Sequence, residues 1–75
     1  MKNEHFDSWL LIGLNILYYR KEKGYTQEML AKKCGKSRAF IQGIETASYS
    51  CSLDTLIKIS NALEIPLKKI FEFRD

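Results

Sequence analysis

Two short helical patterns follow one another closely in the middle of the chain, across residues 26–45. Within each, apolar residues recur at the three- and four-residue spacing that places them on one face of a helix. These apolar positions are Leu30, Ala31 and Cys34 in the first pattern and Phe40, Ile41 and Ile44 in the second. Thr26 and Ser37 precede the two patterns, where a hydroxyl can accept hydrogen bonds from the free N–H groups of a first helical turn. We therefore expect two capped amphipathic helices.

Only Gly35 and Lys36 separate the two expected helices, so the chain must turn sharply between them. Glycine adopts the left-handed backbone conformation that suits such a turn without steric cost. The small side chain of Ala31 lets the two helices cross closely. The stretch is typical of a helix-turn-helix.

Together with its flanks, this stretch resembles the phage-repressor-like (Cro/cI, or XRE, type) helix-turn-helix family. The matching positions are Gln27, Leu30, Ala31, Cys34, Gly35, Ile41 and Ile44. The flanks at 20–27 and 52–59 agree as well, and the resemblance extends over roughly residues 12–71. It implies an all-α fold, a compact five-helix bundle of the lambda-repressor-like DNA-binding kind. Gly43 before Ile44 and Glu45 is similar to the restriction–modification controller proteins.

One domain of five helices is expected over residues 1–75, with the helix-turn-helix at about 26–45. Its first helix should run from about Trp9 to Lys23 and follow a flexible start at residues 1–6. The candidates for the cap of that helix are Asp7 and Ser8.

A polar loop at 46–51 should lead to the fourth helix, and it lacks the glycine and proline that the family usually has there. Ser52 can cap this helix, which should end near Leu63 because the residue before Pro66 avoids helical angles. Pro66 can then open a fifth helix over about 67–73. The expected apolar face of the fourth helix is Leu53, Leu56, Ile57, Ile59, Ala62 and Leu63.

The first helix is apolar almost all round, which is unusual for a chain of this size. Its expected core stripe is Trp9, Ile12, Ile16 and Tyr19, and its other apolar residues are Leu10, Leu11, Leu14, Leu17 and Tyr18. Two arrangements would cover this second face. Either the C-terminal residues Ile70, Phe71 and Phe73 fold back over it, or another chain does.

Positive charge gathers on and beside the helix-turn-helix. Residues 20–38 hold seven Lys or Arg against two Glu, a balance of +5, whereas residues 1–19 and 39–75 each sum to −1. Lysines also serve simply to keep a surface soluble. Their coincidence with the motif favours a polyanionic partner, double-stranded DNA.

In the resembled family, the third helix enters the major groove and the second crosses the phosphate backbone. The resemblance therefore implies base contacts from the outward face of the third helix, at Arg38, Ala39 and Gln42. Arginine can bond guanine, alanine can meet a thymine methyl, and glutamine can pair with adenine.

Contacts to the DNA backbone are implied for a second set of residues: Gln27, Lys33, Lys36, Ser37 and Phe40. Phe40 is also expected to be partly buried, because Ile44 follows it by four residues. Arg20 and Glu45 match a family pair that forms a structural salt bridge between the first and third helices.

Other classes of function find little support. Cys34 and Cys51 have no metal-ligand spacing, His5 stands alone, and neither a phosphate loop nor a partnered nucleophile is visible. We expect no enzyme, no metal and no cofactor. The apolar stretch 9–19 is too short to span a bilayer and does not read as a signal peptide, so the cysteines indicate free thiols in the cytoplasm.

Two functions from different classes remain. The first is a sequence-specific DNA-binding transcriptional regulator, such as a repressor, that acts as a homodimer on a pseudo-palindromic operator. The second is a protein-interaction module, such as the antitoxin of a toxin–antitoxin pair, that holds a protein partner on the apolar face of the first helix.

Overall fold

The chain folds into five helices, as a computed structural model that describes residues 5–73 shows. The helices are α1 (Phe6–Glu22), α2 (Gln27–Cys34), α3 (Arg38–Glu45), α4 (Leu53–Leu63) and α5 (Lys68–Phe71). No strand occurs in this range, so the predicted all-α bundle is confirmed. None of the helices in the described part of the chain is long and apolar enough to cross a membrane.

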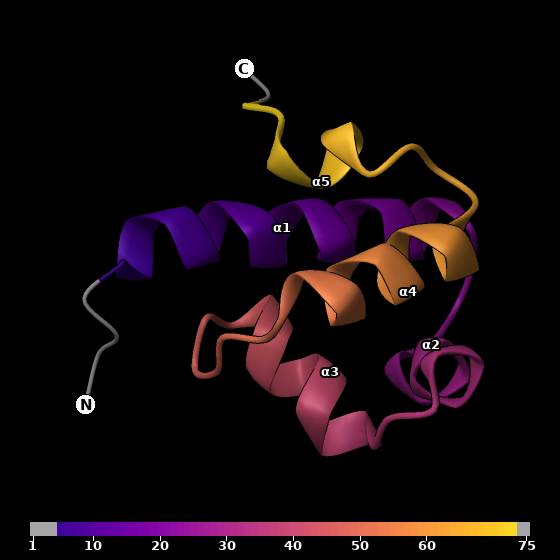
Figure 1. The fold of residues 1–75 in the computed structure, drawn as a ribbon. Coiled ribbons are helices and arrows are strands. Elements are labelled where there is room, and N and C mark those ends of the chain that lie inside the picture. The colour runs from indigo at the N-terminus through magenta and orange to yellow at the C-terminus, as the bar shows by residue number, and fades with distance from the viewer. Residues whose placement is uncertain (1–4, 74–75) are drawn as a thin grey trace.

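α1 is the central element of the bundle. Figure 1 shows α5 along one side of α1, and α3 and α4 along the other, with α2 beyond them. One core joins all five helices, formed by Ile12, Ile16, Leu30, Ala31, Cys34, Ile41, Ile44, Leu56, Ile59, Leu63 and Ile70. The predicted stripes of both motif helices are buried in this core, and Phe40 is partly buried against it.

α1 begins earlier than expected, at Phe6. Its N-cap is His5, and no side chain caps the helix, so the predicted cap at Asp7 or Ser8 is wrong. Asp7 lies instead in the first turn, where its charge favours the positive end of the helix dipole. α1 thus takes in Phe6 from the start that was expected to be flexible, and residues 1–4 of that start lie outside the described residues.

α5 is a single turn that ends at Phe71 rather than Phe73. Asn15, only 1% exposed on α1, donates its side-chain N–H groups to the carbonyl oxygens of Ile70 at 2.7 Å and Glu72 at 2.8 Å. These bonds hold the end of α5 on α1 where the backbone becomes extended at Glu72. Of the three C-terminal residues that could fold back over the second face of α1, only Ile70 is buried, in the core, and Phe71 and Phe73 are exposed. Leu14 and Tyr18 on that face are exposed as well, so this arrangement does not cover it.

α4 follows the predicted bounds, and Ser52 caps it by accepting a hydrogen bond from the Thr55 N–H at 3.1 Å. Its apolar face is narrower than predicted, because α1 and α2 cover one side only. Leu53 and Ile57 are exposed, and that part of the prediction is wrong.

Gly13 sets how closely α1 and α3 approach. A Cβ atom there would lie 2.4 Å from the carbonyl oxygen of Ile44 and 2.8 Å from that of Glu45. Both are backbone atoms of α3, which cannot move aside like a side chain. A residue without a side chain is therefore needed where the two helices cross.

Candidate nucleic-acid interface

The turn between α2 and α3 has the geometry that the sequence predicts. The Thr26 hydroxyl accepts a hydrogen bond from the Met29 N–H at 3.0 Å, and the Ser37 hydroxyl accepts one from the Phe40 N–H at 3.1 Å. Gly35 ends α2 in the left-handed region, with φ of 67°. Both caps and the turn are confirmed, and they fix the direction of α3 from its first residue.

α3 separates a buried face from an exposed one. Ile41 and Ile44 are completely buried. Arg38, Ala39 and Gln42 are all exposed on the opposite side, so the three predicted base-contact residues share one accessible surface. Whether they touch bases stays a prediction.

A buried polar network joins α3 to α1. Glu45 accepts two hydrogen bonds from the Arg20 guanidinium, from Nε at 2.6 Å and from Nη2 at 3.0 Å. Arg20 also donates from Nη1 to the carbonyl oxygen of Tyr25 at 2.8 Å. The two side chains are only 9% and 3% exposed, so the pair predicted from the sequence is both present and buried.

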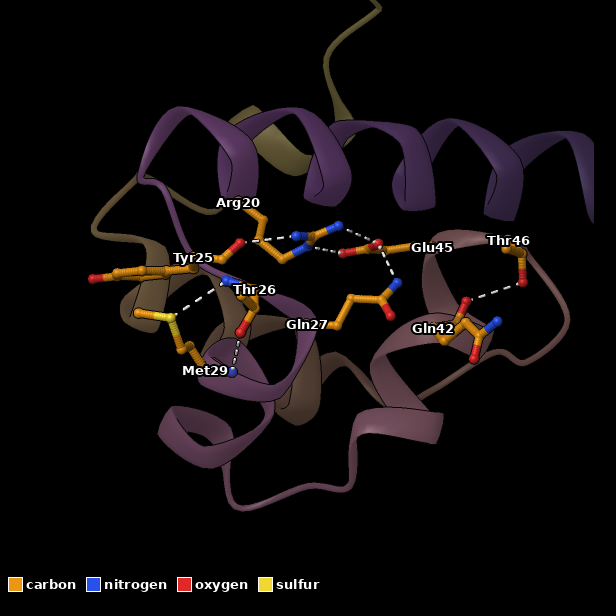
Figure 2. Close-up of polar contacts among 8 residues, drawn as sticks. All are labelled: Arg20, Tyr25, Thr26, Gln27, Met29, Gln42, Glu45 and Thr46. Carbon is orange, nitrogen blue, oxygen red and sulfur yellow. Dashed lines mark hydrogen bonds and ion pairs between the residues drawn. The ribbon is translucent and has the colours of Figure 1, made fainter.

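Gln27 belongs to the same network (Figure 2). Its Nε2 donates to Glu45 Oε1 at 2.9 Å, and the residue is half-buried. An amide nitrogen carries two N–H groups, so this bond leaves one for another acceptor. The network thereby connects Gln27, the first residue of α2, to Glu45, the last residue of α3. Gln27 is also the residue predicted to hold a phosphate.

The other predicted backbone-contact residues lie around the turn. Lys33, Ser37 and Lys36 are exposed or half-exposed. The ammonium of Lys36 lies 5.1 Å from the centre of the Phe40 ring, and that of Lys33 lies 5.1 Å from the centre of the Tyr25 ring. Contact with a ring face is favourable for a cation and orients these flexible side chains.

The loop between α3 and α4 is held to α3 by Tyr49, which the sequence analysis did not single out. The Tyr49 ring covers Gly43 and stacks on the Phe40 ring, with 6.2 Å between ring centres. Ala47 takes the left-handed conformation in this loop, with φ of 62°. Glycine has poor helix propensity, so the presence of Gly43 inside α3 was the one sequence signal of a close neighbour at this position.

The two cysteines are free thiols, as predicted. Cys34 is buried at the end of α2 and Cys51 is half-buried before α4. Burial raises the pKa of both thiols, and the charge of Lys36 opposes this with a smaller lowering. No cluster of metal-ligating side chains occurs among the residues that the structure describes.

Comparison with known proteins places this geometry in context. A sequence model of the helix-turn-helix family HTH_3 matches residues 16–70. Control protein C.BamHI of Bacillus amyloliquefaciens is 37% identical over 65 residues, which are 85% of this chain and 80% of that protein. The immunity repressor of Bacillus phage phi105 is 38% identical over 61 residues, 81% of this chain and 42% of the repressor.

SinR of Bacillus licheniformis, an HTH-type transcriptional regulator, is 33% identical over 66 residues, 87% of this chain and 60% of SinR. The chain thus spans only about half the length of some curated relatives.

Two solved structures share the arrangement of helices. The restriction–modification controller protein C.AhdI from Aeromonas hydrophila has a TM-score of 0.86 and 29% identity, over 92% of this chain and all of that one. SinR in complex with DNA has a TM-score of 0.76 and 34% identity, over 81% of this chain and 98% of that one. The resemblance to phage-repressor-like and controller proteins is confirmed.

Proposed function

The chain belongs to the HTH_3 helix-turn-helix family, and from this membership we propose that it is a sequence-specific DNA-binding transcriptional regulator, which acts as a homodimer on a pseudo-palindromic operator. The observation that carries the proposal is the exposed face of α3, where Arg38, Ala39 and Gln42 stand together on a helix that is otherwise locked into the core. The relatives named as transcriptional regulators, and the DNA complex of SinR, support it.

In this proposal, the residues at the N-terminal end of α3 contact the DNA bases. Arg38 is the first residue after the Ser37 cap, and it is the one long cationic side chain on the exposed face of α3. A bidentate contact from arginine to guanine discriminates by about 1–3 kcal/mol. Ala39 would meet a thymine methyl and Gln42 an adenine.

Contacts to the sugar-phosphate backbone of the DNA come from the side chains around the turn, namely Gln27, Lys33, Lys36, Ser37 and Phe40, and the charge that neutralises phosphates comes from the two lysines. Each cation that neutralises a phosphate releases counterions, so these contacts strengthen binding to any sequence and weaken as salt rises. The charge balance of +5 over residues 20–38 supports this role.

The homodimer would form through surfaces away from α3. Leu14, Leu17 and Tyr18 line a hollow of about 550 Å³ on α1, together with Lys21 and Glu22. In a two-fold interface the same patch meets itself, so Lys21 of one copy can approach Glu22 of the other. Phe71 at the end of α5 and Phe73 beyond it are also exposed, and the proposed interface would include their rings.

Binding assays on two matched variants test the reading role. A preferred duplex is first selected from a randomised library by the wild-type chain, and affinities for it and for a scrambled duplex are measured by fluorescence anisotropy across a salt series. Arg38→Ala should reduce the preference for the selected duplex by about 1–3 kcal/mol. Lys36→Ala should weaken both duplexes alike and lower the salt slope by about one unit. An unchanged preference in Arg38→Ala would remove the main residue of the proposal.

The apolar hollow on α1 also favours a second candidate, a protein-interaction module such as an antitoxin. The mass of the purified chain in solution separates the two. A dimer that dissociates in Leu14→Glu supports the regulator, whereas a monomer, which leaves the apolar face of α1 uncovered, supports the interaction module. The proposal includes a cytoplasmic location, which the free thiols support.

A further inference from the structure

Gly43 and Tyr49 fit together as a pair on the flank of α3. A Cβ atom at position 43 would lie 2.1 Å from Tyr49 Cδ2 and 2.3 Å from Cε2, so the ring occupies the space that any side chain at position 43 would need. The N–H groups of Ser48 and Tyr49 both donate to the carbonyl oxygen of Gly43, at 2.8 and 3.2 Å. Backbone hydrogen bonds from the loop, as well as packing of the ring on Gly43, therefore hold Tyr49 against α3.

This ring lies beside the residues proposed to read DNA. Ala39 and Gly43 are four residues apart, so they lie on the same side of α3. Ala39, Phe40 and Tyr49 line one open hollow of about 470 Å³, together with the hydroxyl-bearing residues Ser37 and Ser50. The small Ala39 thus lines the same hollow as two stacked aromatic rings.

Packing alone does not explain Tyr49. Its residue is 49% exposed, although the ring covers Gly43 and stacks on Phe40. A ring whose only task was to fill the core would lie inside it, as Ile41 and Ile44 do. Tyr49 is instead half exposed and lines the same hollow as Ala39.

We propose that Tyr49 is a specificity-determining residue, which extends the reading surface of α3 from the following loop and forms with Ala39 and Phe40 an apolar site for the methyl group of a thymine. The inference rests on the proposed function. Thymine alone presents a methyl group in the major groove, and apolar side chains recognise it. Gly43 is required for this site, because its lack of a side chain lets the Tyr49 ring pack against α3 beside Ala39.

The direct test removes the methyl group from the DNA. Each thymine of the selected duplex is replaced in turn by deoxyuridine, and the wild-type affinity is measured for each duplex. Burial of one such carbon group is worth about a fourfold change in affinity. We expect one thymine in each half-site to show this loss, and Tyr49→Ala to bind the thymine and deoxyuridine duplexes equally at that position.

Three further variants separate the ring from the fold. Tyr49→Phe keeps the apolar ring and should keep the fourfold preference. Gly43→Ala should displace the ring and lose the preference, and it should have no further effect on the preference when combined with Tyr49→Ala. Ile57→Ala, an exposed apolar position on α4, is the matched control and should behave as the wild-type chain.

The outcomes are distinct. A wild-type chain that selects no sequence from the library overturns the proposed function itself. A wild-type chain that selects a sequence but is indifferent to every deoxyuridine replacement overturns only this inference. Retention of the thymine preference by Tyr49→Ala, with its fold verified by circular dichroism, also overturns it.

Discussion

Removal of one partner from the Arg20–Glu45 pair should destabilise the fold far more than removal of both. Glu45→Leu takes away the acceptor of two hydrogen bonds from Arg20 and one from Gln27. The guanidinium then stays buried with the carbonyl oxygen of Tyr25 as its remaining acceptor in the network. Breaking a buried pair from one side costs about 3–5 kcal/mol, because a charge is left without compensation in a poorly solvated site.

The double variant Arg20→Leu/Glu45→Leu leaves no buried charge. Its cost should be about 1–3 kcal/mol, chiefly from the carbonyl of Tyr25 and the amide of Gln27, which lose partners. With each single replacement at about 3–5 kcal/mol, the coupling energy should be at least about 3 kcal/mol.

Urea unfolding followed by circular dichroism measures all four members of this cycle. A domain of this size has only a small margin of stability, so trimethylamine N-oxide is added to keep the single variants folded. A coupling energy below about 1 kcal/mol would refute the reasoning, because it would mean that neither charge depends on the other for its burial. Lys58→Ala with Asp54→Ala, a surface pair at 3.6 Å, is the control and should show almost no coupling.

Two further predictions concern the helix crossing and the thiols. Gly13→Ala should lower the free energy of unfolding by about 2 kcal/mol, since overpacking against the backbone of α3 costs up to about 3 kcal/mol and alanine returns about 1 kcal/mol of helix propensity; an unchanged urea midpoint would contradict the close crossing. Burial raises the pKa of Cys34 and Cys51 above the ordinary value of about 9.0, so the folded state favours the neutral thiols. Stability from this source is complete below the unfolded pKa and is lost as pH rises through it towards the folded pKa. The variant Cys34→Ala/Cys51→Ala should therefore lose less stability than the wild-type chain above pH 9 or so, and equal alkaline slopes would contradict the burial argument.

The helix-turn-helix was predictable because its signals are local. Thr26 and Ser37 act on N–H groups three residues away, and Gly35 determines its own φ angle. Each can be read from a few neighbouring residues. The resemblance to a family added the Arg20–Glu45 pair, which joins residues 25 positions apart and which local patterns do not predict.

What the sequence did not predict depends on contacts between distant segments. α5 ends at Phe71, two residues before its predicted end, where Asn15 donates hydrogen bonds to the backbone of Ile70 and Glu72. Asn15 lies more than fifty residues away in the chain. The extent of the apolar face of α4 depends on which neighbours cover it, so Leu53 and Ile57 were wrongly assigned.

The candidate site shows the same division. Exposure of Arg38, Ala39 and Gln42 follows from helix periodicity, which also buries Ile41 and Ile44. Tyr49 was missed because it comes from a loop, where no period indicates the direction of a side chain. Gly43, a glycine inside a helix, was the one sequence signal of a close neighbour, and the structure alone identifies that neighbour as Tyr49.

The most direct test of the central claim is a nuclear magnetic resonance titration of the 15N-labelled chain with its selected duplex. If α3 is the DNA-reading helix, the largest amide shifts should lie at residues 37–43, with smaller ones at the start of α2. A scrambled duplex should shift the residues around the turn but spare Arg38, Ala39 and Gln42. Shifts concentrated on Leu14, Leu17 and Tyr18 of α1, with none on α3, would contradict the account.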